Sequence, residues 1–125
     1  MLSQDGEIYE NPEALAEDLV IYMHDTVKEI FMYSRSALKA LDAYFANHPP
    51  AEEYNNNFLW TSFIPALGAY LGTVLVAAFN GEWQLTSPLM KSAILINNKK
   101  VKPFQLGFEV VYEPKNLVDI YDTFS

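Results

Sequence analysis

The sequence predicts a single α+β domain spanning residues 1–125, in which a long amphipathic helical segment and a buried central helix pack on a small antiparallel sheet. Three observations support this prediction. Apolar residues recur at helical spacing over residues 12–46, residues 54–81 carry no charge, and apolar and polar side chains alternate after Gly81. With 125 residues, 50% of them hydrophobic, the chain has enough apolar surface for one core.

The first helix is expected to begin near Pro12, because Asn11 can accept a bond from a free N–H and proline suits the first helical position. One face of residues 12–46 is expected to be buried, with these members: Leu15, Leu19, Tyr22, Met23, Val27, Ile30, Tyr33, Ala37, Leu38, Leu41, Tyr44 and Phe45. A straight helix of that length would measure about 50 Å, which exceeds a globule of this size. Either it breaks, at Asp25-Thr26 or at residues 34–36, or a second chain covers the overhang.

A polar loop is expected over residues 51–57, followed by a central helix that begins near Thr61 or Ser62. This helix is expected to end at Asn80-Gly81, with the glycine in the left-handed conformation. Its apolar run is long enough to suggest a membrane span, but the amphipathic first helix requires a buried partner, so we expect a core helix. Gly68 and Gly72 would allow another element to approach closely.

Period-two alternation around Trp83 predicts a strand, and residues 93–102 predict a hairpin that turns at Asn97-Asn98. Residues 103–112 fit a helix and a strand equally well, so the pattern leaves both open. Apolar residues at helical spacing from Leu117 to Phe124 predict a short closing helix, with Asn116 as a possible cap.

The net charge of −8 lies in the first half of the chain, because residues 1–60 hold eleven acids and three bases, whereas residues 61–125 hold five of each. Such a surface should repel nucleic acid and anionic membranes and attract a basic protein. A solubilising face that binds nothing is the alternative. The candidate partner-binding residues are Glu10, Glu13, Glu17, Asp18, Asp25 and Glu29.

The residues that reactive chemistry needs are scarce. There is no cysteine and there are only two histidines, His24 and His48, so we expect no metal site, no cofactor and no catalytic residues. The alternative is a pocket between the central helix and the sheet, lined by Tyr70, Trp83 and Glu82. The lysines of the hairpin are expected to protect a sheet edge against aggregation; they are Lys99, Lys100 and Lys102.

The segment from Leu67 to Leu75, followed by Asn80-Gly81-Glu82-Trp83, resembles small bacterial domains of uncharacterised function, some of them suspected immunity proteins. Their helix reads roughly Gly-x-Tyr-x-Gly-Glu and their strands begin at Gly-x-Trp. The resemblance covers residues 60–104 best and implies an α+β arrangement. This chain has Thr73 where the pattern has glutamate, so a role for that carboxylate does not carry over.

Taken together, these features favour a non-catalytic acidic binding protein, of the immunity or inhibitor kind, which neutralises a basic partner such as a toxin. A small enzyme or ligand-binding domain built around Trp83 is the alternative. We expect a cytoplasmic protein, because the first residues have no secretory-signal pattern, and a monomer or homodimer.

Overall fold

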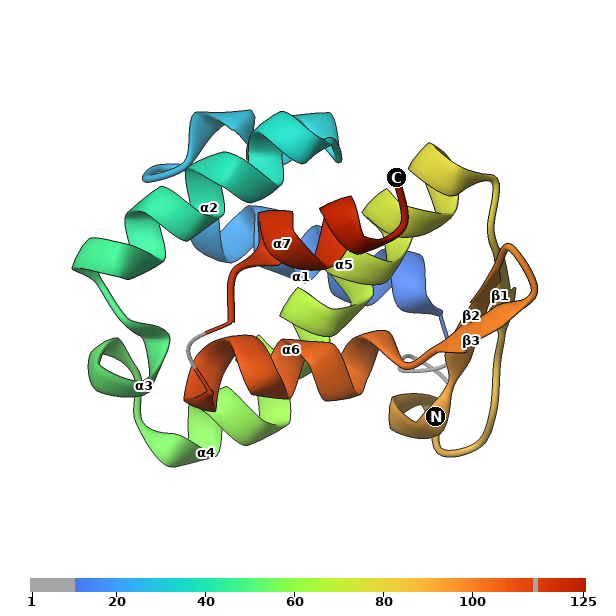
Figure 1. Cartoon of the computed structure of the whole chain (residues 1–125). Coiled ribbons are helices and arrows are strands. Elements are labelled where there is room, and N and C mark those ends of the chain that lie inside the picture. Colours follow the sequence, from blue (N-terminus) through green and yellow to red (C-terminus); the bar gives the residue numbers. More distant parts are fainter. Residues whose placement is uncertain (1–10, 114) are drawn as a thin grey trace.

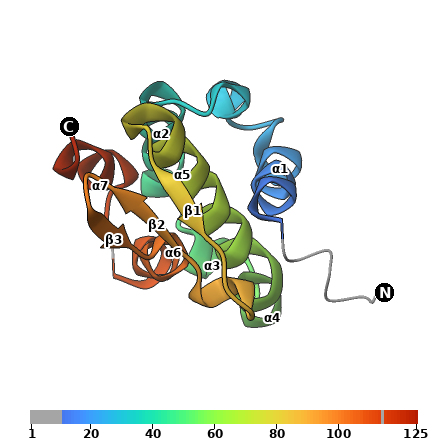
Figure 2. The same ribbon diagram turned by 90° about the vertical axis from the view of Figure 1, so that its right-hand side faces the viewer.

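The structure is a computed structural model that describes residues 11–113 and 115–125 (Figure 1). Helix α5 (Ile64–Phe79) runs through the centre, with α1 on one side and α6, α7 and β3 on the other (Figure 2). The three-stranded sheet and the seven helices confirm the predicted α+β class for this part of the chain. The other elements are α1 (Pro12–Met23), α2 (Arg35–Asn47), α3 (Pro50–Glu53), α4 (Asn56–Phe58), β1 (Glu82–Gln84), β2 (Ala93–Ile96), β3 (Lys99–Val101), α6 (Pro103–Tyr112) and α7 (Leu117–Thr123).

The long amphipathic segment breaks at both expected places. Helix α1 ends at Met23, a 3₁₀ segment follows (Lys28–Met32), and α2 begins after Ser34, whose Oγ accepts the N–H of Ala37 at 3.4 Å. The predicted buried face persists across the breaks, with Tyr33 and Tyr44 half-buried and Tyr22 36% exposed and packed edge-on against Phe58. The break therefore lets one apolar face wrap around α5.

The prediction of a polar loop over residues 51–57 is wrong, because two short helices, α3 and α4, occupy most of this stretch. The side chain of Asn55 accepts the N–H of Phe58 at 2.8 Å and so caps α4. From there the helix continues into α5 through a π-helical turn (Leu59–Phe63), in which the N–H of Ile64 bonds the carbonyl of Leu59. Pro65 follows directly and has no N–H to donate, which favours this shift of bonding register.

Helix α5 forms the core. The continuous helix over Asn56–Phe79 is long and apolar enough to cross a membrane, but 67% of its most apolar window is buried inside the protein. The helix ends where the sequence predicted, but a different residue adopts the left-handed conformation. Asn80, not Gly81, adopts the left-handed conformation (φ 53°), because asparagine tolerates it and the N–H of Gly81 can then bond the carbonyl of Val76.

The sheet has the order β1-β2-β3 and is antiparallel throughout, with Trp83 opposite Ile94 and Ile94 opposite Val101. The predicted hairpin is confirmed: Asn97 and Asn98 both have positive φ, 51° and 66°, as a two-residue turn requires. Strand β3 is an edge strand, and the chain passes from it directly into α6.

Residues 103–112, which fitted two patterns, form helix α6. The helix packs on α5 where two glycines meet: a Cβ added to Gly107 would lie 3.1 Å from the Cα of Gly68. A Cβ added to Gly68 would lie 2.8 Å from the Cα of Phe104. Close packing, which the spacing of Gly68 and Gly72 predicted, therefore joins the two helices.

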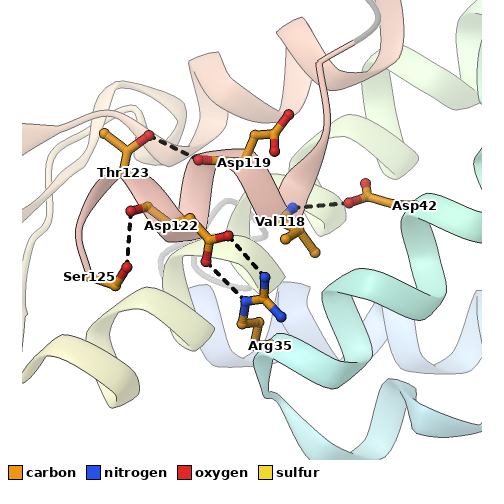
Figure 3. A network of polar contacts seen from close by, with 7 residues as sticks. All are labelled: Arg35, Asp42, Val118, Asp119, Asp122, Thr123 and Ser125. Atoms are coloured by element: carbon orange, nitrogen blue, oxygen red, sulfur yellow. Dashed lines mark hydrogen bonds and ion pairs between the residues drawn. The ribbon is translucent and has the colours of Figure 1, made fainter.

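The closing helix α7 is held by α2 (Figure 3). The carboxylate of Asp42 accepts the N–H groups of Leu117 and Val118, at 2.8 and 3.0 Å. Arg35 donates two bonds to Asp122, each of 2.9 Å. Asn116 sits at the expected cap position but its side chain makes no capping bond, because Asp42 reaches the free N–H groups from the neighbouring helix.

Candidate functional site

Helix α1 carries three of the acidic residues outside its buried face, and two of them, Glu13 and Glu17, border hollows that α5 also lines. Glu13 and Glu17 are exposed and one turn apart, so they share a face. Asp18 is half-buried and lies about 100° further around the helix. Asp25 and Glu29 are exposed in the turn and in the 3₁₀ segment that follow. Glu10 lies outside the described residues.

Little neutralises these carboxylates. Asp25 lies 3.1 Å from Nδ1 of His24. Within residues 11–113 and 115–125, no Lys, Arg or His forms an ion pair with Glu13, Glu17, Asp18 or Glu29. The negative charge of this face is therefore available to a partner.

Three large apolar side chains are exposed on the same stretch of chain. Ile21 is 63% exposed, Phe31 63% and Met32 60%. Ile21 follows Glu17 by one helical turn, and the ring of Phe31 lies 6.4 Å from that of His24, which is also exposed. We call this set the acidic–apolar surface, with the members Glu13, Glu17, Asp18, Ile21, Asp25, Glu29, Phe31 and Met32.

The 3₁₀ segment of this surface is fixed from inside by Tyr70 of α5. Tyr70 is fully buried, and its hydroxyl donates to the carbonyl of Ile30 at 2.7 Å. Its ring stacks on Tyr33, with centroids 4.7 Å apart. Tyr33 itself adopts the left-handed conformation (φ 45°), which is rare for a bulky residue and is held here by that stacking.

Two tyrosine pKa values report on these surroundings. Burial raises the pKa of the Tyr70 hydroxyl far above its usual value. Burial also raises the pKa of Tyr33, and the negative charges of Glu17 and Glu13 add to the effect. Glu13, Glu17 and Tyr33 line a small hollow of about 210 Å³. Both tyrosines are therefore neutral hydrogen-bonding groups at physiological pH.

The three residues expected to form a pocket lie in different places. Tyr70 is in the core, Glu82 is exposed on β1, and Trp83 is half-buried. The indole of Trp83 packs on α5, where a Cβ added to Gly72 would lie 2.5 Å from its Cη2 atom. On its open side Trp83 lines a hollow of about 500 Å³ with Glu13, Thr73 and Leu85. The structure thus brings Trp83 together with the acidic helix.

The histidines occupy helix ends. His24 follows α1 and is exposed, and His48 follows α2, where its ring stacks on Tyr44 with centroids 4.5 Å apart. In the described part of the chain, no group of three His, Cys, Asp or Glu side chains is placed to hold a metal ion.

Sequence reasoning identified the exposed acids but missed the apolar half of the surface. The signal was present: Ile21, Phe31 and Met32 are apolar residues that fall outside the predicted buried face. An apolar residue on the charged side of an amphipathic helix is unusual, and several close together indicate a contact surface.

No protein-family model, curated protein or solved structure matches this chain. The resemblance to small bacterial domains therefore stays a prediction. In the structure, the glycines that carry it are close-packing positions, and the hydroxyl of Thr73 donates to the carbonyl of Ala69 at 2.8 Å.

Proposed function

We propose that this protein is a non-catalytic binding protein, of the immunity or inhibitor kind, whose acidic–apolar surface docks on a basic protein. One observation carries the proposal: residues 13–32 combine four carboxylates that form no ion pair among the described residues, those of Glu13, Glu17, Asp18 and Glu29, with three large apolar side chains that are at least 60% exposed. We place the protein in the cytoplasm and expect neither nucleic acid nor membrane as its partner, because both present negative charge to this surface.

The composition of the surface matches that of protein interfaces. An interface combines an apolar centre, which supplies affinity, with a polar rim that sets orientation. Here Ile21, Phe31 and Met32 would supply the centre, and the carboxylates would steer a basic partner during diffusional encounter. A face that only kept the protein soluble would need the charges but not the exposed apolar side chains.

The experiment begins with the product of the neighbouring gene, co-expressed with this protein and purified as a complex. Association is then measured for Glu13→Lys/Glu17→Lys and for a control, Glu52→Lys/Glu53→Lys, which makes the same charge change at exposed acids of α3. We expect the first variant to associate at least about tenfold more slowly and the control to differ little. High salt should slow the unmodified protein in the same way.

The apolar centre is tested separately with Phe31→Ser. Because Phe31 is exposed, the variant should fold normally but dissociate faster, with a loss of affinity of about tenfold or more. A complex that is indifferent to salt, to the α1 charges and to Phe31 would contradict the proposed function.

A further inference from the structure

Strand β3 and helices α6 and α7 lie on the opposite side of α5 from α1 (Figure 2), and residues of β3, the start of α6 and the end of α7 line another hollow. Its volume is about 480 Å³, within the range of pockets that hold small molecules. Val101, Leu106, Ile120 and Phe124 contribute apolar side chains to its lining. Helix α7, which forms one wall, is fixed to α2 by the bonds of Arg35 with Asp122 and of Val118 with Asp42, shown in Figure 3.

Positive charge is concentrated around this hollow. Four of the eight basic residues of the chain line it, namely Lys99, Lys100, Lys102 and Lys115. Lys115 is paired with Glu109, and the acid in the lining is Asp119. Among the described residues, Lys99, Lys100 and Lys102 form no ion pair. A protein with a net charge of −8 thus carries a local basic site.

Protection of a sheet edge accounts for part of this arrangement. Lysines on an edge strand prevent pairing with other chains, as expected for β3. That role needs the charges alone. It does not need an apolar hollow beside them, nor a fourth lysine supplied by the connection between α6 and α7. The combination of an apolar lining and a cationic rim is complementary to a molecule that is apolar at one end and negative at the other.

We propose that this hollow binds a small amphipathic anion, a carboxylate or sulfonate on an aromatic or aliphatic body. The apolar body lies against Leu106, Ile120 and Phe124, and the anionic group contacts Lys100 and Lys102. An acidic polypeptide is the competing occupant, but strand β3 has only three residues, which is short for pairing with an added strand.

The test uses 8-anilino-1-naphthalenesulfonate, an anionic probe, and N-phenyl-1-naphthylamine, a similar aromatic probe without charge. Each is titrated by fluorescence into the folded protein, into Lys100→Gln/Lys102→Gln, and into the control Lys28→Gln/Lys39→Gln. All four lysines are exposed, so both variants should fold. We expect the first variant to bind the anionic probe about tenfold more weakly or worse, the uncharged probe to change less than about twofold, and the control to match the unmodified protein.

Amide chemical-shift mapping then locates the probe. Shifts that concentrate on residues 99–106 and 117–124 support the proposal. Shifts elsewhere, or equal affinities for the anionic probe in both lysine variants, would overturn it. Hexaglutamate tests the competing occupant. If it binds more tightly than 8-anilino-1-naphthalenesulfonate, the site is assigned to an acidic polypeptide and the proposal is overturned. These lysines are far from the acidic–apolar surface, so failure here leaves the proposed function untouched.

Discussion

Gly72 shows how a single residue fixes the position of the sheet on α5. A Cβ added to it would lie 2.5 Å from Cη2 and 2.7 Å from Cζ2 of Trp83, well inside van der Waals contact. The indole therefore occupies the space that a side chain would take, and Trp83 can approach the helix this closely only because residue 72 is glycine.

The change Gly72→Ala should therefore destabilise the protein. Alanine favours a helix over glycine by about 1 kcal/mol, but overpacking against the indole costs about 1–3 kcal/mol, so we expect a net loss in the free energy of unfolding measured with urea. The double variant Gly72→Ala/Trp83→Phe should lose less than the sum of the two single changes, because the smaller ring leaves room for the methyl group. A Gly72→Ala protein as stable as the original would contradict this packing.

At the scale of elements, the attachment of α7 to α2 depends on a cap that comes from another helix. Asp42 is half-buried, and burial raises the pKa of its carboxyl, partly offset by the N–H groups of Val118 and Leu117. An aspartate whose pKa is higher in the folded state than in the unfolded state takes up its proton first in the folded protein. Its contribution to stability is therefore larger in acid and is lost as the pH rises through the folded pKa.

Asp42→Asn tests this cap. At pH 7 the amide offers one acceptor oxygen to two N–H groups, so we expect a modest loss of stability, smaller than the roughly 1 kcal/mol of Asp42→Ala. As the pH falls from 7 towards the unfolded value of about 3.9, the original protein should gain stability relative to Asp42→Asn. Parallel pH profiles of the two proteins, measured by urea unfolding, would show that the burial of Asp42 has no energetic effect.

Local signals predicted the helix and turn boundaries well where a side chain acts within a few residues. Asn11 and the Asn97-Asn98 turn act in the structure as the sequence indicated, and the chain breaks before α2 at one of the two expected places. The sequence left the structure open where distant contacts decide: residues 103–112 are helical, and the glycine contact between this helix and α5 is remote in sequence. Asn116 was expected to cap α7, but Asp42, which is remote in sequence, accepts the free N–H groups there.

At the scale of the whole molecule, the three acids of α1 and the lysine-lined hollow beside β3 lie on opposite sides of α5 (Figure 2). The acidic side was predicted because net charge can be summed along the chain. The apolar half of the surface and the lysine-lined hollow were not, because each depends on which segments meet in space. Lys115 joins the hairpin lysines only through the placement of α7.

Acids without ion-pair partners repel one another, so they should lower the stability of the fold. Such residues are expected on a surface that serves binding, not folding. Glu17→Gln removes a like-charge neighbour of Glu13 and should raise the free energy of unfolding by about 0.2–0.5 kcal/mol at low salt. Glu109→Gln makes the same charge change but loses the bond to Lys115, so it should bring no gain. The gain at Glu17 should fade in 1 M NaCl, where charges are screened. Equal effects of the two changes would contradict the distinction between paired and unpaired acids.

The 3₁₀ segment is held in place from its buried side, where the hydroxyl of Tyr70 donates to the carbonyl of Ile30. Its other side faces water. Exchanging the exposed Phe31 or Met32 should leave that bond intact, so the surface should tolerate single substitutions there without loss of stability. Under the proposed function, such a protein would be able to follow an evolving antagonist, changing the residues it presents while its backbone stays the same.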